Sequence, residues 1–309
     1  MAIYKGNKKA VAVYKGSTTI NKIYKGSTLV FQKSGGGGST HLFEGTARGN
    51  LDLKINSKII PISPDADGKW FYDTDEKITS LNNAFYRQRE VTSVDLSNLD
   101  LTGISTRSMF EQTYVTSIKF NNTKSMKLVD VNSMFSLCSS LTSINLSSFD
   151  TSNLTSVNSL FKGCNKLVSL DLSNWNTSSL TTADSLFSGC RLLTSINLSS
   201  FNTSNLTSAN YLFNNCNSLT SINLSSFDTS NLTSATGLFV YCSSLVSLDL
   251  SNFDMSNATS YKDMFANCPK LSTIKCKQTF KDWCITNQDT IKLPTAMREG
   301  GSGTWEIVG

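Results

Sequence analysis

Six cysteines recur along the chain at a constant interval of 26 residues: Cys138, Cys164, Cys190, Cys216, Cys242 and Cys268. Thiols can bind zinc or form disulfides, but zinc sites generally pair ligands about two to four residues apart. The closest two cysteines, Cys276 and Cys284, lie outside this series and are eight residues apart. We therefore expect no metal ion and no cofactor, and we interpret the six cysteines as buried structural thiols. For Cys276 and Cys284 a disulfide is the alternative, which a reducing cytoplasm would prevent.

Side chains suited to catalysis are scarce. The only histidine, His41, lies beside a glycine-rich stretch, whereas nucleophilic Ser-His-Asp and Cys-His sites need a histidine that is held in place. Asp171 and Asp249 could pair their carboxylates, but they are three repeats apart, about 14 Å at the spacing of stacked strands. Glycosidase carboxylates lie roughly 5 to 10 Å apart. We therefore expect a protein without enzymatic activity.

The cysteine interval belongs to a repeat that covers most of the chain. Phenylalanine recurs at positions 85, 110, 135, 161, 187, 213, 239 and 265, and each of the six cysteines lies three residues after one of them. Residues 143–156, SINLSSFDTSNLTS, return letter for letter at 221–234. A fixed period of this length indicates a solenoid, because one unit alone cannot bury its apolar side.

Each unit combines two hydrophobic patterns. Ile144 and Leu146 alternate with polar residues, which predicts a short strand with one buried face. Leu154, Val157, Leu160 and Phe161 follow at three- and four-residue spacing, which favours a short helical segment. The sequence therefore predicts an α/β solenoid of units of about 26 residues, over residues 76–276.

The pattern M/L-F-x-x-C-x-x-L-[TV]-S-[IL]-x-L-S-x-[FW], as in LFKGCNKLVSLDLSNW at 160–175, resembles the BspA-like branch of leucine-rich repeats. Such repeats are common on the surfaces of host-associated bacteria and in protists. The resemblance implies an extended, slightly curved scaffold for binding or adhesion, and it implies no particular ligand.

The charge of the chain is small and local. The formal net charge is +5, but residues 1–33 contain seven lysines and no acidic residue. The repeats are rich in Ser, Thr and Asn, so we expect no nucleic-acid partner. No segment approaches 18 consecutive apolar residues, so we expect no membrane span, and the first residues lack the apolar run of a secretory signal.

The N-terminal residues 1–33 contain Tyr-Lys-Gly three times, at Tyr4, Tyr14 and Tyr24. The glycines suit tight hairpins, so we predict four short strands in a basic β-hairpin module. It resembles repeats of tail, fibre and other virion-associated proteins of phages that infect gut bacteria, which implies an anchor with Tyr4, Tyr14 and Tyr24 as candidate contacts; an ordinary small β cap is the alternative. SGGGGST at 34–40 is predicted to be a flexible linker.

Both ends of the solenoid need caps, because the last apolar face would otherwise meet water. Residues 41–75 are predicted to form an N-terminal β cap around the turn-rich PISPDADG. Residues 277–309 are predicted to form a C-terminal cap, with Phe280, Trp283 and Cys284 on a closing helix and GGSGTWEIV as a final strand. The alternative for Trp305, Ile307 and Val308 is a contact between subunits of a homo-oligomer.

Two sets of residues are candidate ligand contacts. One is the outward column of the strand face, which a purely structural role explains equally well: Asn145, Asp171, Asn197, Asn223 and Asp249. The other lies where the units differ most, around the helical segment and the turn after it: Lys162, Arg191, Tyr241 and Lys270.

Two functions remain open. The first is a phage virion protein of the tail, fibre or head surface, assembled in the bacterial cytoplasm. Residues 1–33 would bind other virion proteins, and the solenoid would bind a bacterial surface protein or a mucus glycan. The alternative is a BspA-like cell-surface adhesin of a bacterium or protist, whose export signal is absent from this sequence.

Overall fold

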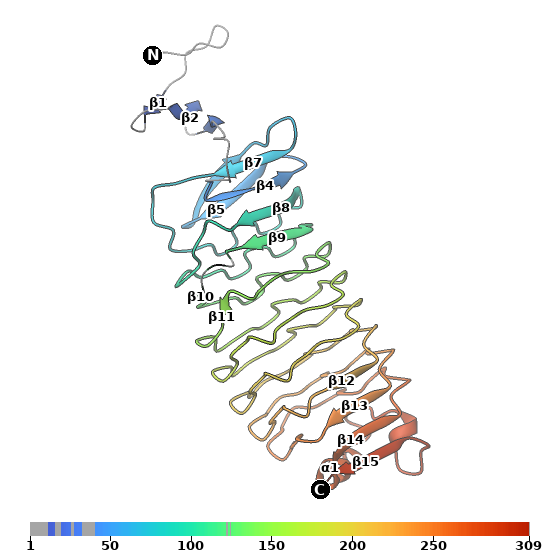
Figure 1. The fold of residues 1–309 in the computed structure, drawn as a ribbon. Coiled ribbons are helices and arrows are strands. Elements are labelled where there is room, and N and C mark those ends of the chain that lie inside the picture. Colours follow the sequence, from blue (N-terminus) through green and yellow to red (C-terminus); the bar gives the residue numbers. More distant parts are fainter. Residues whose placement is uncertain are drawn as a thin grey trace.

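The chain forms a stack of coils, each one sequence repeat long (Figure 1). This computed structural model describes residues 12–15, 20–25, 28–32, 41–121, 123 and 125–308. The stack begins at the antiparallel strands around β4 and ends at β15, near the C-terminus. The predicted solenoid is confirmed.

The N-terminal strands are β1 (Ala12–Lys15), β2 (Ile20–Lys25) and β3 (Thr28–Gln32). They form an antiparallel sheet in the order β1-β2-β3, with Tyr14 in β1 and Tyr24 in β2. Tyr4, the first predicted strand, the glycine turns and the linker 34–40 lie outside the described residues. The four-stranded hairpin module stays a prediction.

The solenoid begins under antiparallel strands. The strands β4 (Phe43–Ala47), β7 (Lys69–Tyr72), β8 (Val91–Leu96) and β9 (Ser117–Phe120) form one sheet in the order β7-β4-β8-β9. The pairing is antiparallel up to β8 and parallel between β8 and β9. The strands β5 (Leu51–Ile55) and β6 (Lys58–Ile62) form a separate hairpin. Buried Trp70 packs on Phe85, with ring centroids 5.7 Å apart, and so covers the first coil.

Parallel strands occupy the predicted strand position in some coils only. Besides β8 and β9 they are β12 (Ser221–Asn223), β13 (Ser247–Leu250) and β14 (Thr273–Lys277), whereas β10 (Met126–Lys127) and β11 (Phe149–Asp150) form a separate two-stranded parallel sheet. No strand forms at residues 142–146, 168–172 and 194–198. The prediction of a strand in every unit was therefore wrong for these coils. Leu146 is nevertheless buried. Core packing keeps alternate side chains pointing inward there. Neighbouring coils are joined at this place by single backbone hydrogen bonds, such as that from Val168 N to Thr142 O (3.3 Å).

The predicted helical segments are consecutive β-turns, so the α/β assignment was wrong for the repeats. In the coil around Phe135, the amides of Met134, Ser136 and Cys138 donate to the carbonyl three residues earlier, while those between them, including Phe135, donate to the next coil. A left-handed residue every four positions, such as Ser133 (φ 56°) and Leu137 (φ 59°), stops a helix from continuing. Turns of this kind give the same three- and four-residue spacing of buried side chains as a helix.

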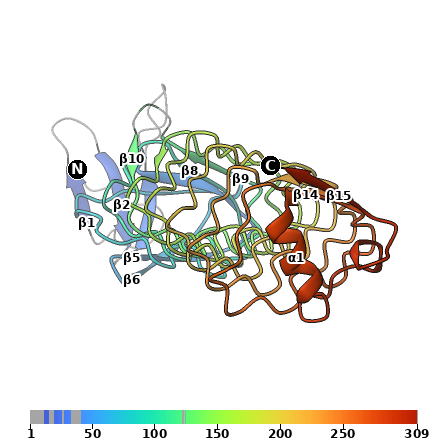
Figure 2. The ribbon, with the colours of Figure 1, turned by 90° about the horizontal axis from the view of Figure 1, so that it is seen from below.

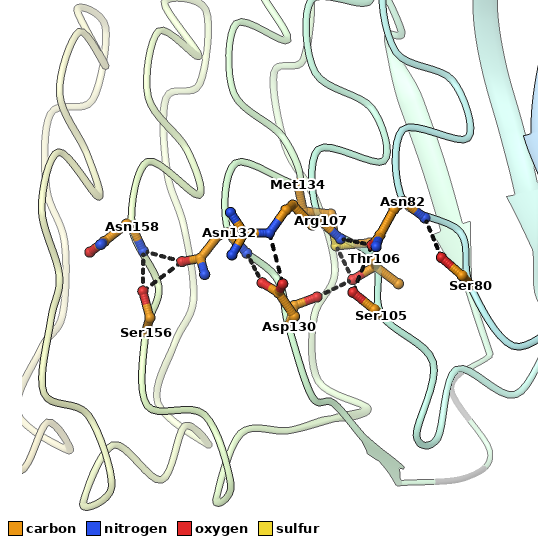
Figure 3. A network of polar contacts seen from close by, with 10 residues as sticks. All are labelled: Ser80, Asn82, Ser105, Thr106, Arg107, Asp130, Asn132, Met134, Ser156 and Asn158. Atoms are coloured by element: carbon orange, nitrogen blue, oxygen red, sulfur yellow. Dashed lines mark hydrogen bonds and ion pairs between the residues drawn. The ribbon is translucent and has the colours of Figure 1, made fainter. Parts of the chain in front are cut away.

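A column of side-chain amides and carboxylates joins these turns across the coils (Figure 3). Asn132 Oδ1 accepts hydrogen bonds from Ser156 Oγ (2.7 Å) and from the amide of Asn158 (2.8 Å). The same arrangement recurs at Asn82, Asp184 and Asn210. Each coil therefore holds the start of the next turn segment in place.

Aromatic and threonine columns fill the interior. The eight phenylalanines from Phe85 to Phe265 stack with centroids 5.0 to 6.2 Å apart and planes within 16° of parallel. A second column stacks Trp175, Phe201 and Phe227. Buried threonines make polar links between coils; for example, Thr177 Oγ1 donates to Asn202 O (3.0 Å) and accepts from the Asn202 amide (2.7 Å).

The C-terminal end is closed by α1 (Gln278–Thr286), the 3-10 turn η1 (Thr295–Met297) and β15 (Thr304–Val308). Figure 2 looks at this end and shows α1 in front of the coils. Phe280 and Cys284 are buried on α1, and β15 pairs in parallel with β14. Among the described residues, no helix has the length and apolar character needed to cross a membrane.

The polar column makes a stability prediction at Asn210. Asn210→Ala removes the acceptor of Ser234 Oγ and of the Thr236 amide, so we expect the free energy of unfolding to fall by about 1–3 kcal/mol. Asn210→Asp keeps an acceptor oxygen, as Asp184 has in the preceding coil, and should lose less. Urea denaturation of both variants is the measurement. Equal losses would contradict a role for the acceptor oxygen.

Candidate functional site

The strand-face column follows the repeat along the stack, and where the coils form strands its members pair in register: Asn223 pairs with Asp249, and Asp249 with Lys275. Each of its five predicted contact residues has an oxygen that accepts the amide two residues later, at 2.9 to 3.1 Å: Asn145, Asp171, Asn197, Asn223 and Asp249. These bonds are Asx-turns, which end each strand segment. The side chains of this column therefore have a structural role, which is to hold these turns.

The carboxylates of this column are held ionised. The hydrogen bonds from the backbone and side chain of Ser173 lower the pKa of Asp171. At Asp249, partial burial raises the pKa, but bonds from Ser251 and Lys275 outweigh it, and the net shift is downward. Lys275 Nζ lies 3.1 Å from Asp249 Oδ2. The two carboxylates are thus anions committed to their own turns rather than a proton-sharing pair.

The second predicted set lies on the turn edge of the solenoid. Lys162, Arg191, Tyr241 and Lys270 are all exposed, and they come from four different coils. Tyr241 differs from the other three, because it lines two neighbouring hollows of about 560 and 450 Å³. Lys162, Arg191 and Lys270 line neither hollow.

Tyr211 is a surface residue that our sequence analysis missed. It lines the larger hollow together with Tyr241, Asp263 and Asn267. Both hollows are bounded by Lys292 of the C-terminal cap. The sequence did contain a signal for Tyr211, because this tyrosine interrupts a column of serines. The equivalent residues in the three preceding coils are Ser133, Ser159 and Ser185.

The six thiols of the cysteine series are buried and bonded to the stack. Each Sγ donates to the carbonyl of a phenylalanine in the preceding coil, such as Cys190 to Phe161 O (3.2 Å). Burial raises the pKa of Cys138, Cys190 and Cys268 to about 12. Cys276 and Cys284 are likewise buried, free thiols. Among the described residues, no group of three or more His, Cys, Asp or Glu side chains is placed to hold a metal ion.

His41 belongs to the N-terminal cap. Its Nδ1 lies 2.9 Å from Asp73 Oδ2, and its ring stacks on Phe71 with centroids 4.4 Å apart. Asn98 Nδ2 donates to the His41 carbonyl (2.7 Å). These contacts give His41 a place in holding the cap against the first coil.

Comparisons with known proteins point to the repeat. A family model described as Mycoplasma protein of unknown function, DUF285, matches residues 79–195 and 165–283. Together with the stacked coils, this match supports the leucine-rich, BspA-like repeat predicted from the sequence. A similar solved structure is a leucine-rich cell surface protein from Faecalibacterium prausnitzii A2-165, at 15% identity over 70% of this chain and 86% of that chain. The TM-score between the two structures is 0.22. No curated protein matches the chain.

The burial of all eight cysteines predicts slow thiol chemistry. At pH 8 we expect a bulky thiol reagent to label at most a few of them in the folded protein, because thiolates are the reactive form and burial suppresses them. All eight should react in concentrated urea. Rapid labelling of six or more in the native protein would show that the series faces solvent.

The raised thiol pKa values also predict loss of stability in alkali. The folded state keeps a proton on Cys190 up to a pKa of about 12, whereas the unfolded chain loses it near pH 9. Unfolding is therefore favoured as pH rises above about 9. Between pH 8 and 10, the free energy of unfolding should fall by about 1.4 kcal/mol less in Cys190→Ala than in the parent protein. Urea denaturation at the two pH values is the measurement. An identical loss in both proteins would contradict this assignment.

Proposed function

We propose that this chain, which belongs to the family of Mycoplasma proteins of unknown function DUF285, is a non-enzymatic binding scaffold displayed at a cell surface. One observation carries the proposal: the family match, residues 79–283, falls on the stacked coils. A long solenoid of short polar side chains presents a large surface, and such surfaces are used for binding. The BspA-like resemblance of the repeat is the support for a location at the cell surface.

Binding fits the polar groups of the repeats better than catalysis does. The strand-face Asn and Asp oxygens hold Asx-turns, and the internal threonines link coils. Groups committed in this way support a rigid display surface. As partners we propose a surface protein or a glycan, bound through the solenoid, and no nucleic acid, because Lys and Arg are sparse in the repeats.

The virion hypothesis gains no support. It depends on residues 1–33, and the family match begins at residue 79. The cell-surface alternative of the sequence analysis is therefore our main proposal. Incorporation into phage particles becomes one outcome of the experiment below.

The test is protease shaving of intact cells that produce the protein. If the solenoid is displayed, proteinase K should remove the full-length chain from intact cells while a cytosolic marker survives, and an antibody against residues 79–283 should label those cells. Protection of the chain until lysis would contradict surface display. Enrichment of the chain in purified phage particles would restore the virion hypothesis.

A further inference from the structure

We propose that the hollow between Tyr211 and Tyr241 is a binding site for a neutral oligosaccharide. The inference rests on the proposed function and deepens it, since it names the site and the ligand class. Four lines of observation carry it: the placing of the two rings, their backbone conformation, the polar groups around them, and the wall supplied by the C-terminal cap.

The two tyrosines stand on adjacent coils and remain exposed. Tyr211 is 43% and Tyr241 is 54% exposed, and both line the hollow of about 560 Å³, a volume within the usual range for small-ligand sites. Tyr211 occupies space that Gly237 leaves open: a Cβ on Gly237 would lie 2.6 Å from Cδ1 and Cε1 of Tyr211. The missing side chain at Gly237 thus lets the Tyr211 ring lie against the coil that carries Tyr241.

The backbone at both tyrosines does not require a ring. Tyr211 has φ 57° and Tyr241 has φ 63°, a left-handed conformation that is unfavourable for bulky residues. Other coils fill the position of Tyr211 with small or short polar residues such as Ser185, and that of Tyr241 with residues from Gly189 to Leu137, all with the same left-handed backbone. Neither hydroxyl has a hydrogen bond to the described residues. The coil does not need a phenol ring at either place, so the rings are available for a ligand.

The polar groups of the hollow are available as well. Asp263, Asn267 and Lys292 line it, and within the described part of the chain their side chains make no hydrogen bond or ion pair. Asn217, by contrast, is used to hold the site, because its Nδ2 donates to the Tyr241 carbonyl (3.2 Å). A carboxylate, an amide and an ammonium group together can both accept and donate hydrogen bonds.

These groups fit a sugar better than other partners. A pyranose presents an apolar C–H face that can lie on a phenol ring, and a rim of hydroxyls that both donate and accept hydrogen bonds. The hollow carries one anion, Asp263, and one cation, Lys292, so it offers no net charge to a polyanion. A protein partner would call for a broader apolar centre.

The C-terminal cap extends the site beyond a single sugar. Tyr241, Asn267 and Lys292 also line the second hollow, of about 450 Å³, whose far wall is Pro294, Thr295 and Ala296. Two hollows that share Tyr241 provide adjoining subsites. We therefore infer a ligand of two or more sugar units.

The test uses the full chain and an array of immobilised neutral, sialylated and sulfated oligosaccharides. We expect the parent protein to bind neutral members. Tyr211→Ser and Tyr241→Gly introduce residues that other coils have at the same positions, so the fold is retained, and each should weaken binding of the best array member about tenfold or more. Tyr211→Phe and Tyr241→Phe keep the rings and should retain most of the affinity.

Leu137→Gly is the matched control. Leu137 occupies the position of Tyr241 in a distant coil, is 41% exposed and has φ 59°, so its replacement should leave binding unchanged. Absence of binding to every neutral oligosaccharide, or equal binding by the parent, Tyr211→Ser and Tyr241→Gly, would overturn the proposal even if the protein is found on cells. Tyrosine-dependent binding by a protein that proves to be intracellular would uphold this site and remove the surface function.

Discussion

The fold depends on backbone amides that reach from one coil to the next. On the turn side, alternate amides bond within their own coil and the remaining ones donate to the following coil, as Phe161 does to Leu186 O (3.0 Å). A coil therefore has no complete set of backbone partners until its neighbour is in place. This requirement explains why the sequence repeats surface positions too: in SINLSSFDTSNLTS, Asn145 holds an Asx-turn and Thr151 bonds to the Asn176 carbonyl.

The strictness of the repeat gives meaning to its exceptions. Where identical neighbours satisfy one another, a departure that the stack does not need points to another use. Tyr211 is the one aromatic residue in a column of asparagine, serine, glycine and aspartate, and Tyr241 the one in a column that also contains arginine, glutamine, leucine, glycine and asparagine. Gly237 departs beside Tyr211. Leu137 over Gly163 shows that a large side chain over glycine also occurs far from this site. What distinguishes the tyrosine pair is the surrounding set of polar side chains and the cap.

Much of the fold could be predicted from the sequence, because the spacing of apolar residues shows which side chains are buried and how long each coil is. Leu146, Phe161 and Cys164 lie in the core for the reason their spacing indicates. The helical segments could not be told from β-turns, since both place apolar residues three and four apart, and the left-handed backbone at Ser159 has no reliable mark in the sequence. Tyr211 was missed because its hollow is completed by Lys292, 81 residues further along the chain.

The site and the end of the stack share one physical cause. Because turn-side amides point to the following coil, the amides of the last coil would be unpaired without the cap. Carbonyls of the cap accept them: the Asp263 amide donates to Thr290 O (2.9 Å) and the Phe265 amide to Ile291 O (2.8 Å). At the other end the carbonyls need donors, and Lys54 N supplies one to Ala84 O (3.0 Å). The C-terminal cap must therefore pass directly beside the last turn segment. That path carries Lys292 and Pro294 to Tyr241, so the requirement to close the ladder also builds the wall of the proposed sugar site.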